Sequence, residues 1–386
     1  MKTLVYGLAR SGYSVIERLE ERGDEVVSVD RTLGNEDDLG VLDGVELLVK
    51  SPGVPGEAPL VTAARERGIP VWSEVELGYR LLPDAKLIGV TGTNGKTTTV
   101  ELLGAIFRAA GRDVAVAGNV GVPLTSIRGA DWVVCELSSF QLEDVHELAC
   151  DVAVLLNLEP DHLDRHGTFE HYRAAKLRIF ERARAKVVPR GLGLDGIEFG
   201  STDPLPAEPL IRGAHNRENA AAATATARAA GIGDDAIAEA LRTFPGVPHR
   251  LELVAERDGV RFVNDSKATN VAAALRALAA YADEPVHLIL GGSPKGEDFA
   301  PLAAAIGPNV KSVHLIGAEG PRIGEAVEGE LDVTLARAVA HAREMAQPGD
   351  VVLLSPACAS FDQFDNFEAR GDAFRALVGS GTGQTP

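Results

Sequence analysis

The stretch that decides the fold is Leu87-Ile-Gly-Val-Thr-Gly-Thr-Asn-Gly-Lys-Thr-Thr-Thr99. Its apolar start, Leu87–Val90, predicts a buried strand, and the residues from Thr97 onward carry apolar side chains at helical spacing. The loop between them has glycines at positions 92 and 95. A strand, a glycine-rich loop and a helix in this order predict a phosphate site, because loop N–H groups and the helix dipole favour phosphate oxygens.

The residue types in this loop fit a nucleoside triphosphate. Lys96 would reach the β- and γ-phosphates, and the Thr97 hydroxyl would hold Mg²⁺. The strict pattern G-x-x-x-x-G-K-[ST] requires glycine where this chain has Val90, so the loop departs from it at one residue. The alternative is a turn that uses glycines without binding phosphate, but the strand–loop–helix context favours phosphate binding.

Composition restricts the partners and the compartment. A chain of 386 residues with 45% hydrophobic content can bury several cores, and its length predicts two or three domains. The net charge of −18 argues against a nucleic-acid partner, because such proteins use Lys and Arg to neutralise phosphates. The three cysteines lack disulfide or zinc-ligand spacing, and neither a signal peptide nor a membrane-spanning run is recognisable. We therefore expect a cytoplasmic protein without membrane insertion.

The first 85 residues predict a Rossmann-like α/β domain. A strand that ends at Gly7, a helix over Tyr13–Arg22 and a strand over Glu25–Val29 form a βαβ beginning, with Asp30 after the second strand. The glycine spacing is weaker evidence than the G-x-G-x-x-G fingerprint. A small nucleotide-recognition domain and a doubly wound domain without a ligand both remain open here, whereas nothing downstream suits hydride transfer.

Residues 86–246 predict a central phosphate-loop domain. The apolar strand 131–136 ends in Glu136, at a position that commonly supplies a metal partner in phosphate-loop proteins. A further strand leads into segment 157–166, whose three carboxylates and two histidines are costly unless they are solvated or bound. A surface loop is one interpretation of this segment, and its position favours metal and phosphate binding. The segment 186–213 predicts a shortened peripheral sheet.

Residues 247–386 again predict alternating strands and helices. Strands over 260–264, 286–290, 313–316 and 351–354 are each followed by small or polar residues, where an open parallel sheet binds ligands. The predicted fold is therefore an α/β protein of three domains: an N-terminal Rossmann-like domain (1–85), a central ATPase-like domain with a mostly parallel sheet (86–246), and a C-terminal Rossmann-like α/β domain (247–386).

Several motifs, taken in chain order, resemble the Mur ligases of peptidoglycan synthesis. They are the loop 91–97, Glu136-Leu-Ser-Ser-Phe-Gln141, Asp161-His162, Tyr172-Arg-Ala-Ala-Lys176 and His215-Asn216. The blocks His249-Arg250, Asn264-Asp-Ser-Lys-Ala-Thr-Asn270 and 355–364 are similar to the branch that adds D-glutamate. The resemblance implies ATP-dependent ligation of D-glutamate to UDP-N-acetylmuramoyl-L-alanine, through an acyl phosphate and a tetrahedral intermediate, by a cytoplasmic monomer.

The resemblance also assigns roles to residues of this chain. The implied catalytic residues are Lys96, Glu136, His162, Lys176 and Lys267. Two Mg²⁺ ions are implied, with Thr97, Glu136, His162 and Lys176 as ligands, the lysine in carbamylated form. The implied ATP contacts are Gly92, Thr93, Asn94, Gly95, Lys96, Thr97, Thr98, Asn216, Asn219, Arg250 and Asp265.

The resemblance also implies which residues contact the two other substrates. Around the UDP substrate it implies Arg10, Ser11, Asp30, Arg31, Thr32, Ser51, Pro52, Gly53, Asn119 and Ser138. Around D-glutamate it implies Thr269, Lys295, Ser360 and Phe367. The family often has Thr-Arg after the strand-end acid of the first domain, whereas this chain has Arg31-Thr32, so the uridine contacts are the least specific of these assignments.

Three other functions compete with this one. A sister ligase of the same fold would add another amino acid to a muramoyl peptide, or glutamate to folate. A non-catalytic nucleotide-binding module would bind ATP without releasing phosphate, although the retention of Lys96, Glu136, His162 and Lys176 argues against degeneration. A phosphate-loop switch protein would leave the two additional α/β domains without a role.

Overall fold

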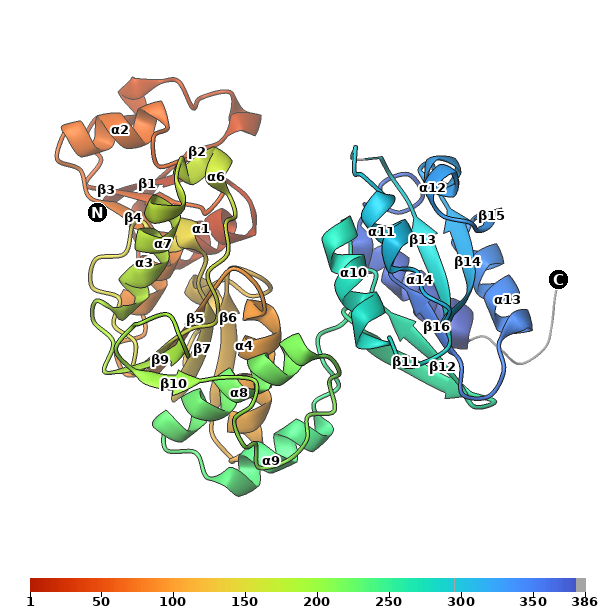
Figure 1. The fold of residues 1–386 in the computed structure, drawn as a ribbon. Coiled ribbons are helices and arrows are strands. Elements are labelled where there is room, and N and C mark those ends of the chain that lie inside the picture. Colours follow the sequence, from red (N-terminus) through yellow and green to blue (C-terminus); the bar gives the residue numbers. More distant parts are fainter. Residues whose placement is uncertain (295, 380–386) are drawn as a thin grey trace. The chain divides into compact units, whose positions relative to one another are not determined.

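The computed structural model describes residues 1–294 and 296–379, and three sheets organise them (Figure 1). The first sheet is parallel, in the order β2-β1-β3-β4. Its strands are β1 (Lys2–Tyr6), β2 (Glu25–Val29), β3 (Leu47–Lys50) and β4 (Val71–Ser73). Its helices are α1 (Arg10–Glu21), η1 (Arg31–Leu33), η2 (Leu39–Leu42), α2 (Pro59–Glu66) and α3 (Glu74–Arg80).

The second sheet has the order β10-β9-β8-β5-β7-β6, and all of its pairs are parallel. Its strands are β5 (Lys86–Thr91), β6 (Val114–Gly118), β7 (Trp132–Glu136), β8 (Val152–Leu155), β9 (Ala185–Pro189) and β10 (Ile197–Phe199). Its helices are α4 (Lys96–Ala109), η3 (Leu124–Ser126), α5 (Ser139–Leu142), α6 (Leu163–His166), α7 (Phe169–Leu177), η4 (Arg178–Phe180), α8 (Ala214–Ala229) and α9 (Asp234–Thr243).

The third sheet has the order β11-β12-β16-β13-β14-β15, with β11 antiparallel and the other pairs parallel. Its strands are β11 (Glu252–Arg257), β12 (Val260–Asn264), β13 (Val286–Gly291), β14 (Val310–Ile316), β15 (Glu330–Val333) and β16 (Val351–Leu354). Its helices are α10 (Val271–Ala280), α11 (Ala300–Ala305), α12 (Gly320–Ala326), α13 (Leu335–Met345) and α14 (Phe367–Gly379).

Burial explains why the central strands have nearly continuous apolar sequences. All residues of β7 and β8 are buried, as are the four of β16, because helices cover both faces of a parallel sheet. The segment predicted as a shortened sheet contributes β9 and β10, which pair in parallel at the edge of the second sheet. None of the helices in the described part of the chain combines the length and the apolar character that crossing a membrane requires.

The chain forms two compact units. Residues 1–209 and 215–244 make the first, and residues 210–214 with the chain from 245 onward make the second. The first unit therefore contains two sheets, which buried polar contacts join. The carboxylate of Glu74 accepts hydrogen bonds from the N–H and the hydroxyl of Thr125, and Glu76 accepts bonds from the backbone N–H groups of residues 146–148.

Candidate active site

The predicted phosphate loop lies between β5 and α4, in the first unit. Gly92 and Gly95 have φ angles of 152° and 84°, which favour glycine. A Cβ atom at Gly95 would lie 2.2 Å from Oδ1 of Asn219, and one at Gly92 would lie 2.9 Å from Cβ of Leu156. The glycines thus let the backbone pass close to its neighbours, and the first N–H groups of α4, which have no carbonyl partner within the helix, begin at the loop.

Lys96 bends back over this loop. Its Nζ donates hydrogen bonds to the carbonyl oxygens of Gly92 and Thr93, each at 2.9 Å. Val90, the departure from the strict pattern, is a fully buried residue of β5. The departure therefore falls in the strand and leaves the glycines at 92 and 95 and the lysine of the loop in place.

Oxygen atoms suited to a hard cation meet beside the loop. The Thr97 hydroxyl donates to Oε2 of Glu136 at 2.9 Å, and the Asn119 amide donates to Oε1 of the same carboxylate at 3.3 Å. Glu136 ends β7, which pairs with β5, so the sheet itself brings the carboxylate to the loop. A hydroxyl and a buried carboxylate are ligands that Mg²⁺ accepts, and the predicted Thr97–Glu136 pair therefore fits that ion.

Lys176 is buried rather than solvated. This residue of α7 is only 2% exposed, and its Nζ donates a hydrogen bond to the carbonyl oxygen of Gly92 at 2.8 Å. Burial, with a smaller contribution from nearby Lys96, lowers the pKa of Lys176 to about 7, against the opposing charges of Asp161 and Glu136. A substantial fraction of this amine is consequently neutral near neutral pH.

His162 adopts a different environment from the other predicted ligands. Its side chain is 51% exposed, its Nε2 lies 3.5 Å from Oδ2 of Asp161, and its ring centroid lies 5.0 Å from that of Phe140. The backbone at His162 has φ of 50°, in the left-handed region. Its role as a metal ligand stays a prediction.

Two residues of the predicted segment 157–166, which the sequence reasoning did not single out, hold the loop. Asn157 accepts a hydrogen bond from the Asn94 N–H through its side chain at 2.8 Å, and Glu159 accepts one from the Asn94 amide at 2.9 Å. Both follow β8, the strand on the other side of β5. That adjacency was the available signal, because residues after neighbouring parallel strands meet at one edge of the sheet.

Two of the predicted ATP contacts lie together on α8. Asn216 and Asn219 are both buried, and the Asn219 amide donates to Oδ1 of Asn216 at 3.2 Å. Because Asn219 also faces Gly95, this helix stands directly beside the phosphate loop.

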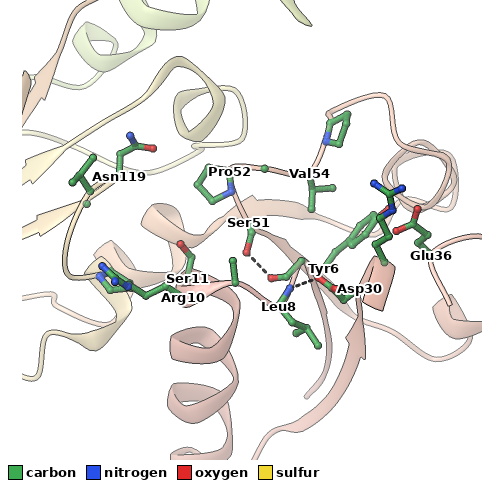
Figure 2. Close-up of a pocket in the computed structure, with 18 of the residues that line it drawn as sticks. Tyr6, Leu8, Arg10, Ser11, Asp30, Glu36, Ser51, Pro52, Val54 and Asn119 are labelled. Carbon is green, nitrogen blue, oxygen red and sulfur yellow. Dashed lines mark hydrogen bonds between the residues drawn. The ribbon is translucent and has the colours of Figure 1, made fainter. Parts of the chain in front are cut away.

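A cavity of about 730 Å³ lies between the first sheet and the loop that follows β6 (Figure 2). Arg10 and Asn119 lie toward one end of the view and Glu36 toward the other. Eight of the residues predicted to contact the UDP substrate line it, and they are Arg10, Ser11, Asp30, Arg31, Ser51, Pro52, Gly53 and Asn119. Sequence reasoning missed Tyr6, Val54 and Glu36, which also line it.

Hydrogen bonds fix the walls of this cavity. Oδ2 of Asp30 accepts from the Leu8 N–H at 2.6 Å, and this bond contributes most to a lowered pKa of the Asp30 carboxyl. The Ser51 hydroxyl donates to the carbonyl of Gly7 at 2.7 Å (Figure 2). Thr32 donates its hydroxyl to Oδ1 of Asp30, which gives this predicted contact a partner within the protein.

Ser138 has a structural role in this arrangement. It caps α5, and its hydroxyl accepts a hydrogen bond from the Gln141 N–H, while the Gln141 side chain accepts one from the Ser138 N–H. Its predicted contact with the UDP substrate stays a prediction.

In the second unit, Asp265 is buried at the end of β12. The Ser355 hydroxyl donates to its Oδ2 at 2.8 Å, and the Leu251 N–H donates to Oδ1 at 3.2 Å. Burial outweighs these bonds and raises the pKa of Asp265 to about 7. Lys267 follows in the same loop, and its Nζ lies 5.4 Å from the ring centroid of Phe367.

The other residues predicted to contact D-glutamate differ in their environments. Ser360 is buried, and its hydroxyl makes no hydrogen bond within the described part of the chain. Thr269 is half-buried in the loop before α10. Lys295 lies outside the described residues.

Arg370 joins the loops around these residues and was missed by the sequence reasoning. It is 1% exposed, and its guanidinium donates to the carbonyl oxygens of Ser266, Cys358 and Ala359 at 2.9–3.1 Å. Its Nε also donates to the Ser266 hydroxyl at 2.9 Å. An arginine on a C-terminal helix carries no local sign of such a role, because all of its partners are distant in sequence.

The fold and the loop define the class, a phosphate-loop α/β protein with further α/β sheets before and after the loop domain. Comparison with family models identifies residues 90–190 as a Mur ligase middle domain and residues 249–358 as a Mur ligase glutamate ligase domain. The chain belongs to the Mur ligase family, so the family predicted from its motifs is confirmed.

Curated relatives match almost the whole chain. It is 40% identical to the UDP-N-acetylmuramoylalanine–D-glutamate ligase of Myxococcus xanthus, over 98% of each chain. It is 41% identical to the ligase of the same name from Sphingopyxis alaskensis, over 97% of this chain and 96% of the relative. The first alignment runs over 447 positions, more than the 386 residues of this chain, so this chain has gaps in it.

Solved structures share the fold at low identity. The UDP-N-acetylmuramate–alanine ligase of Thermotoga maritima matches with a TM-score of 0.63 and 18% identity, over 99% of this chain and 100% of that one. A bifunctional folylpolyglutamate synthase/dihydrofolate synthase of Yersinia pestis, complexed with AMPPNP and a manganese ion, matches with a TM-score of 0.58 and 19% identity, over 79% and 92%. The predicted α/β fold class is confirmed.

Proposed function

We propose that this chain is an ATP-dependent ligase that joins D-glutamate to UDP-N-acetylmuramoyl-L-alanine during synthesis of the peptidoglycan precursor. The observation that carries the proposal is the match, near 40% identity and almost end to end, to curated ligases named for that reaction. The phosphate loop, with Lys96 across it and Thr97 bonded to Glu136, supplies the chemistry that such a reaction needs.

The reaction needs a phosphoryl transfer followed by an acyl transfer. An oxygen of the L-alanyl carboxylate attacks the γ-phosphorus of ATP, which releases ADP and leaves an acyl phosphate. The amine of D-glutamate then adds to the acyl carbon, and the tetrahedral intermediate loses inorganic phosphate and a proton to give the amide. The first step brings two anions together, so cationic groups must neutralise the transferring phosphoryl group.

In this proposal the loop residues perform the neutralisation. Lys96 would exchange its two carbonyl partners for phosphate oxygens, while the N–H groups at the start of α4 hold the β-phosphate. Thr97 and Glu136 would hold one Mg²⁺, and Glu136, His162 and carbamylated Lys176 a second. When bound, these ions neutralise the charge that spreads over the transferring phosphoryl group.

Carbamylation of Lys176 is proposed from its environment. Carbon dioxide adds only to a neutral amine, and the buried amine of Lys176 has a pKa of about 7. The product is an anion that would replace a buried cation next to Lys96. Lys96 favours that exchange, because it disfavours a second positive charge at this position.

We assign the uridine diphosphate end of the substrate to the cavity beside the first sheet. Its volume of about 730 Å³ suits a nucleotide-sized ligand. Arg10 and Arg31 are its cationic lining residues and would face the diphosphate. The Asp30 carboxylate already accepts hydrogen bonds from the Leu8 and Thr32 N–H groups. We therefore assign it to holding the cavity wall in place, and its remaining lone pairs would accept a hydrogen bond from a polar group of the ligand.

We assign the amino-acid substrate to the second unit. Lys267, Thr269, Ser360 and Phe367 are the residues proposed to surround D-glutamate or the reacting centre, with Lys295 outside the described residues. The buried Ser360 hydroxyl, which lacks a hydrogen bond within the described residues, is available to a ligand. Arg250 and Asp265 are proposed nucleotide contacts of this unit.

The remaining assignments follow from the same proposal. The division into a UDP-substrate domain (1–85), an ATP domain (86–246) and an amino-acid domain (247–386) is its functional partition. A monomer in the cytoplasm is the expected working form, and sedimentation with cell fractionation would test both expectations.

The deciding experiment measures phosphate release from ATP and Mg²⁺ with UDP-N-acetylmuramoyl-L-alanine and a panel of D- and L-amino acids. Release that depends on D-glutamate is the expected result. Release with another amino acid would move the chain to a sister ligase, and release with a folate would favour the folylpolyglutamate type. Binding of ATP without release in any combination would support a non-catalytic module.

A further inference from the structure

Four side chains with metal-binding chemistry gather in the second unit, and none of them is a residue assigned above. His314 lies on β14, Glu330 and Asp332 on the edge strand β15, and His341 on α13, which packs against both strands (Figure 1). One potential ligand atom from each of the four lies within 4.8 Å of the others. Imidazole nitrogens and carboxylate oxygens together form the ligand set that transition-metal ions such as Zn²⁺ prefer.

Asp332 is the central residue of this cluster. Its side chain is fully buried, and Oδ2 accepts a hydrogen bond from Nδ1 of His314 at 2.8 Å. Oδ1 lies 2.6 Å from Nδ1 of His341, but the contact lacks hydrogen-bond geometry. Within the described residues neither of these two buried atoms has a hydrogen-bond partner. A buried carboxylate oxygen in that position is costly, and a cation that accepts a lone pair from both atoms would satisfy them.

The backbone brings these ligands to one place. Glu330 and Asp332 are two residues apart on β15, so their side chains share a face, and Glu330 pairs with His314 in the register. The register then shifts before Val333, whose φ of 69° is rare for a β-branched residue. A tight turn there closes with a hydrogen bond of 2.7 Å from the Thr334 N–H to the Asp332 carbonyl.

A chain of polar contacts behind the cluster fixes the Asp332 carboxylate. Nε2 of His314 lies 2.8 Å from the Ser312 hydroxyl, and that hydroxyl lies 2.7 Å from Nδ1 of His287. Nε2 of His287 in turn lies 3.1 Å from Oδ2 of Asp350. Outer partners of this kind orient the ligands of metal sites in proteins.

We propose that Glu330, Asp332 and His341 bind a divalent transition-metal ion, and that His314 is a positioning residue that holds the Asp332 carboxylate. The Glu330 and His341 side chains are 56% and 30% exposed, so an ion has access from solvent, and water completes its coordination. The bound ion joins α13 to the edge strand β15. The site involves none of the residues proposed to hold Mg²⁺, all of which belong to the first unit.

The experiment is a calorimetric titration of the full-length chain with ZnCl₂, in excess MgCl₂ and AMPPNP so that the proposed phosphate-loop sites are occupied. The variants are His341→Gln and Asp332→Asn, with Glu325→Gln as the control, because Glu325 is an exposed carboxylate on the neighbouring helix α12. Substitution with Co²⁺ and absorption spectroscopy would report the ligands, since nitrogen and oxygen donors give a characteristic visible spectrum.

We expect wild type and Glu325→Gln to bind one Zn²⁺ with equal affinity, and His341→Gln to weaken that binding at least tenfold. Asp332→Asn tests the buried ligand, and His341→Gln, which changes a partly exposed residue, keeps the test valid if Asp332→Asn does not fold. The proposal is wrong if wild type binds no Zn²⁺ below millimolar concentration. It is equally wrong if folded His341→Gln binds Zn²⁺ as tightly as wild type does.

Discussion

Lys176 combines two properties that rarely occur together in a lysine, nearly complete burial and a position directly over the phosphate loop. We predict that Lys176→Ala lowers phosphate release on the order of 100-fold or more, because a charged group at the transferring phosphate is lost. Added short carboxylic acids should restore part of the activity by replacing the carbamate.

The control for this substitution is Lys186→Ala, which removes a lysine of β9 whose Nζ lies 5.9 Å from the Phe180 ring. It should leave the rate unchanged within about twofold. Full activity of folded Lys176→Ala would refute the carbamate role. Lost activity that no carboxylic acid restores, together with lost AMPPNP binding, would indicate a structural role instead.

Asp265 gives a second prediction for a single residue, on stability against pH. Its folded-state pKa of about 7 lies above the unfolded value of 3.8, so the folded state keeps a proton that the unfolded state releases. The stabilisation is complete below the unfolded pKa and is lost as the pH rises through the folded pKa. Between about pH 4 and 7 the free energy of unfolding of wild type should fall by up to about 4 kcal/mol relative to that of Asp265→Asn.

Chemical denaturation of wild type and Asp265→Asn at several pH values would measure that difference. The amide keeps the shape of the carboxyl and cannot ionise, so the difference in unfolding free energy isolates this group. A difference that does not change with pH over this interval would show that Asp265 is ionised in the folded state, despite its burial.

At the scale of elements, the turn from β5 into α4 decides whether the loop can accept phosphate. Gly95→Ala would place a methyl group 2.2 Å from Oδ1 of Asn219, at a φ of 84°. Gly111, just beyond the other end of α4, also has a positive φ (67°), but a Cβ there would meet nothing within 4 Å. Both substitutions place alanine at a positive φ, but only Gly95→Ala adds a collision and changes the phosphate loop itself.

We therefore expect Gly95→Ala to weaken AMPPNP binding at least tenfold, and Gly111→Ala to leave it unchanged within about twofold, as titration calorimetry would measure. Equal affinities in the two variants would mean that α8 moves aside and that the loop tolerates a larger residue.

The loops at the ends of β12, β13 and β16 depend on Arg370 of α14. Arg370→Lys keeps the charge but loses the planar fork, and it leaves buried carbonyl oxygens without donors. We expect a loss of about 2–4 kcal/mol of unfolding free energy in the second unit. Arg375→Lys, on the same helix with partly exposed carboxylate partners, should cost less than about 1 kcal/mol. Similar costs for both variants would contradict the assigned role of Arg370.

The sequence could predict the features that depend on neighbouring residues, but not those that depend on contacts between different elements. Local pattern placed the strand before the phosphate loop, and it predicted a shortened peripheral sheet in the segment that contains most of β9 and all of β10. The helix after the loop and the carboxylate at the end of β7 follow from local rules as well. By contrast, the interactions of Arg370, and the Asp332 carboxylate between two histidines, join residues of different elements. No spacing rule contains them.

At the scale of the whole molecule, the chain consists of two units with separate apolar cores. The core around β13 and β16 lies entirely in the second unit, and the core around β5 and β8 in the first. Units with their own cores unfold independently unless a large interface couples them. Calorimetry should therefore resolve two transitions, and each ligand should shift most the transition of the unit that holds most of its proposed contacts.

AMPPNP with Mg²⁺ should raise the melting temperature of the first unit, because its phosphate loop belongs there. At a ligand concentration about 100 times Kd the gain is about 2.7 kcal/mol, which corresponds to a rise of roughly 5–11 °C for a unit of this size. Zn²⁺ should raise the other transition, and should not do so in His341→Gln. The second transition alone should also respond to Arg370→Lys. A single transition that moves as one with either ligand would show instead that the units unfold together, and the effects of all the substitutions would then have to be assigned to the whole chain.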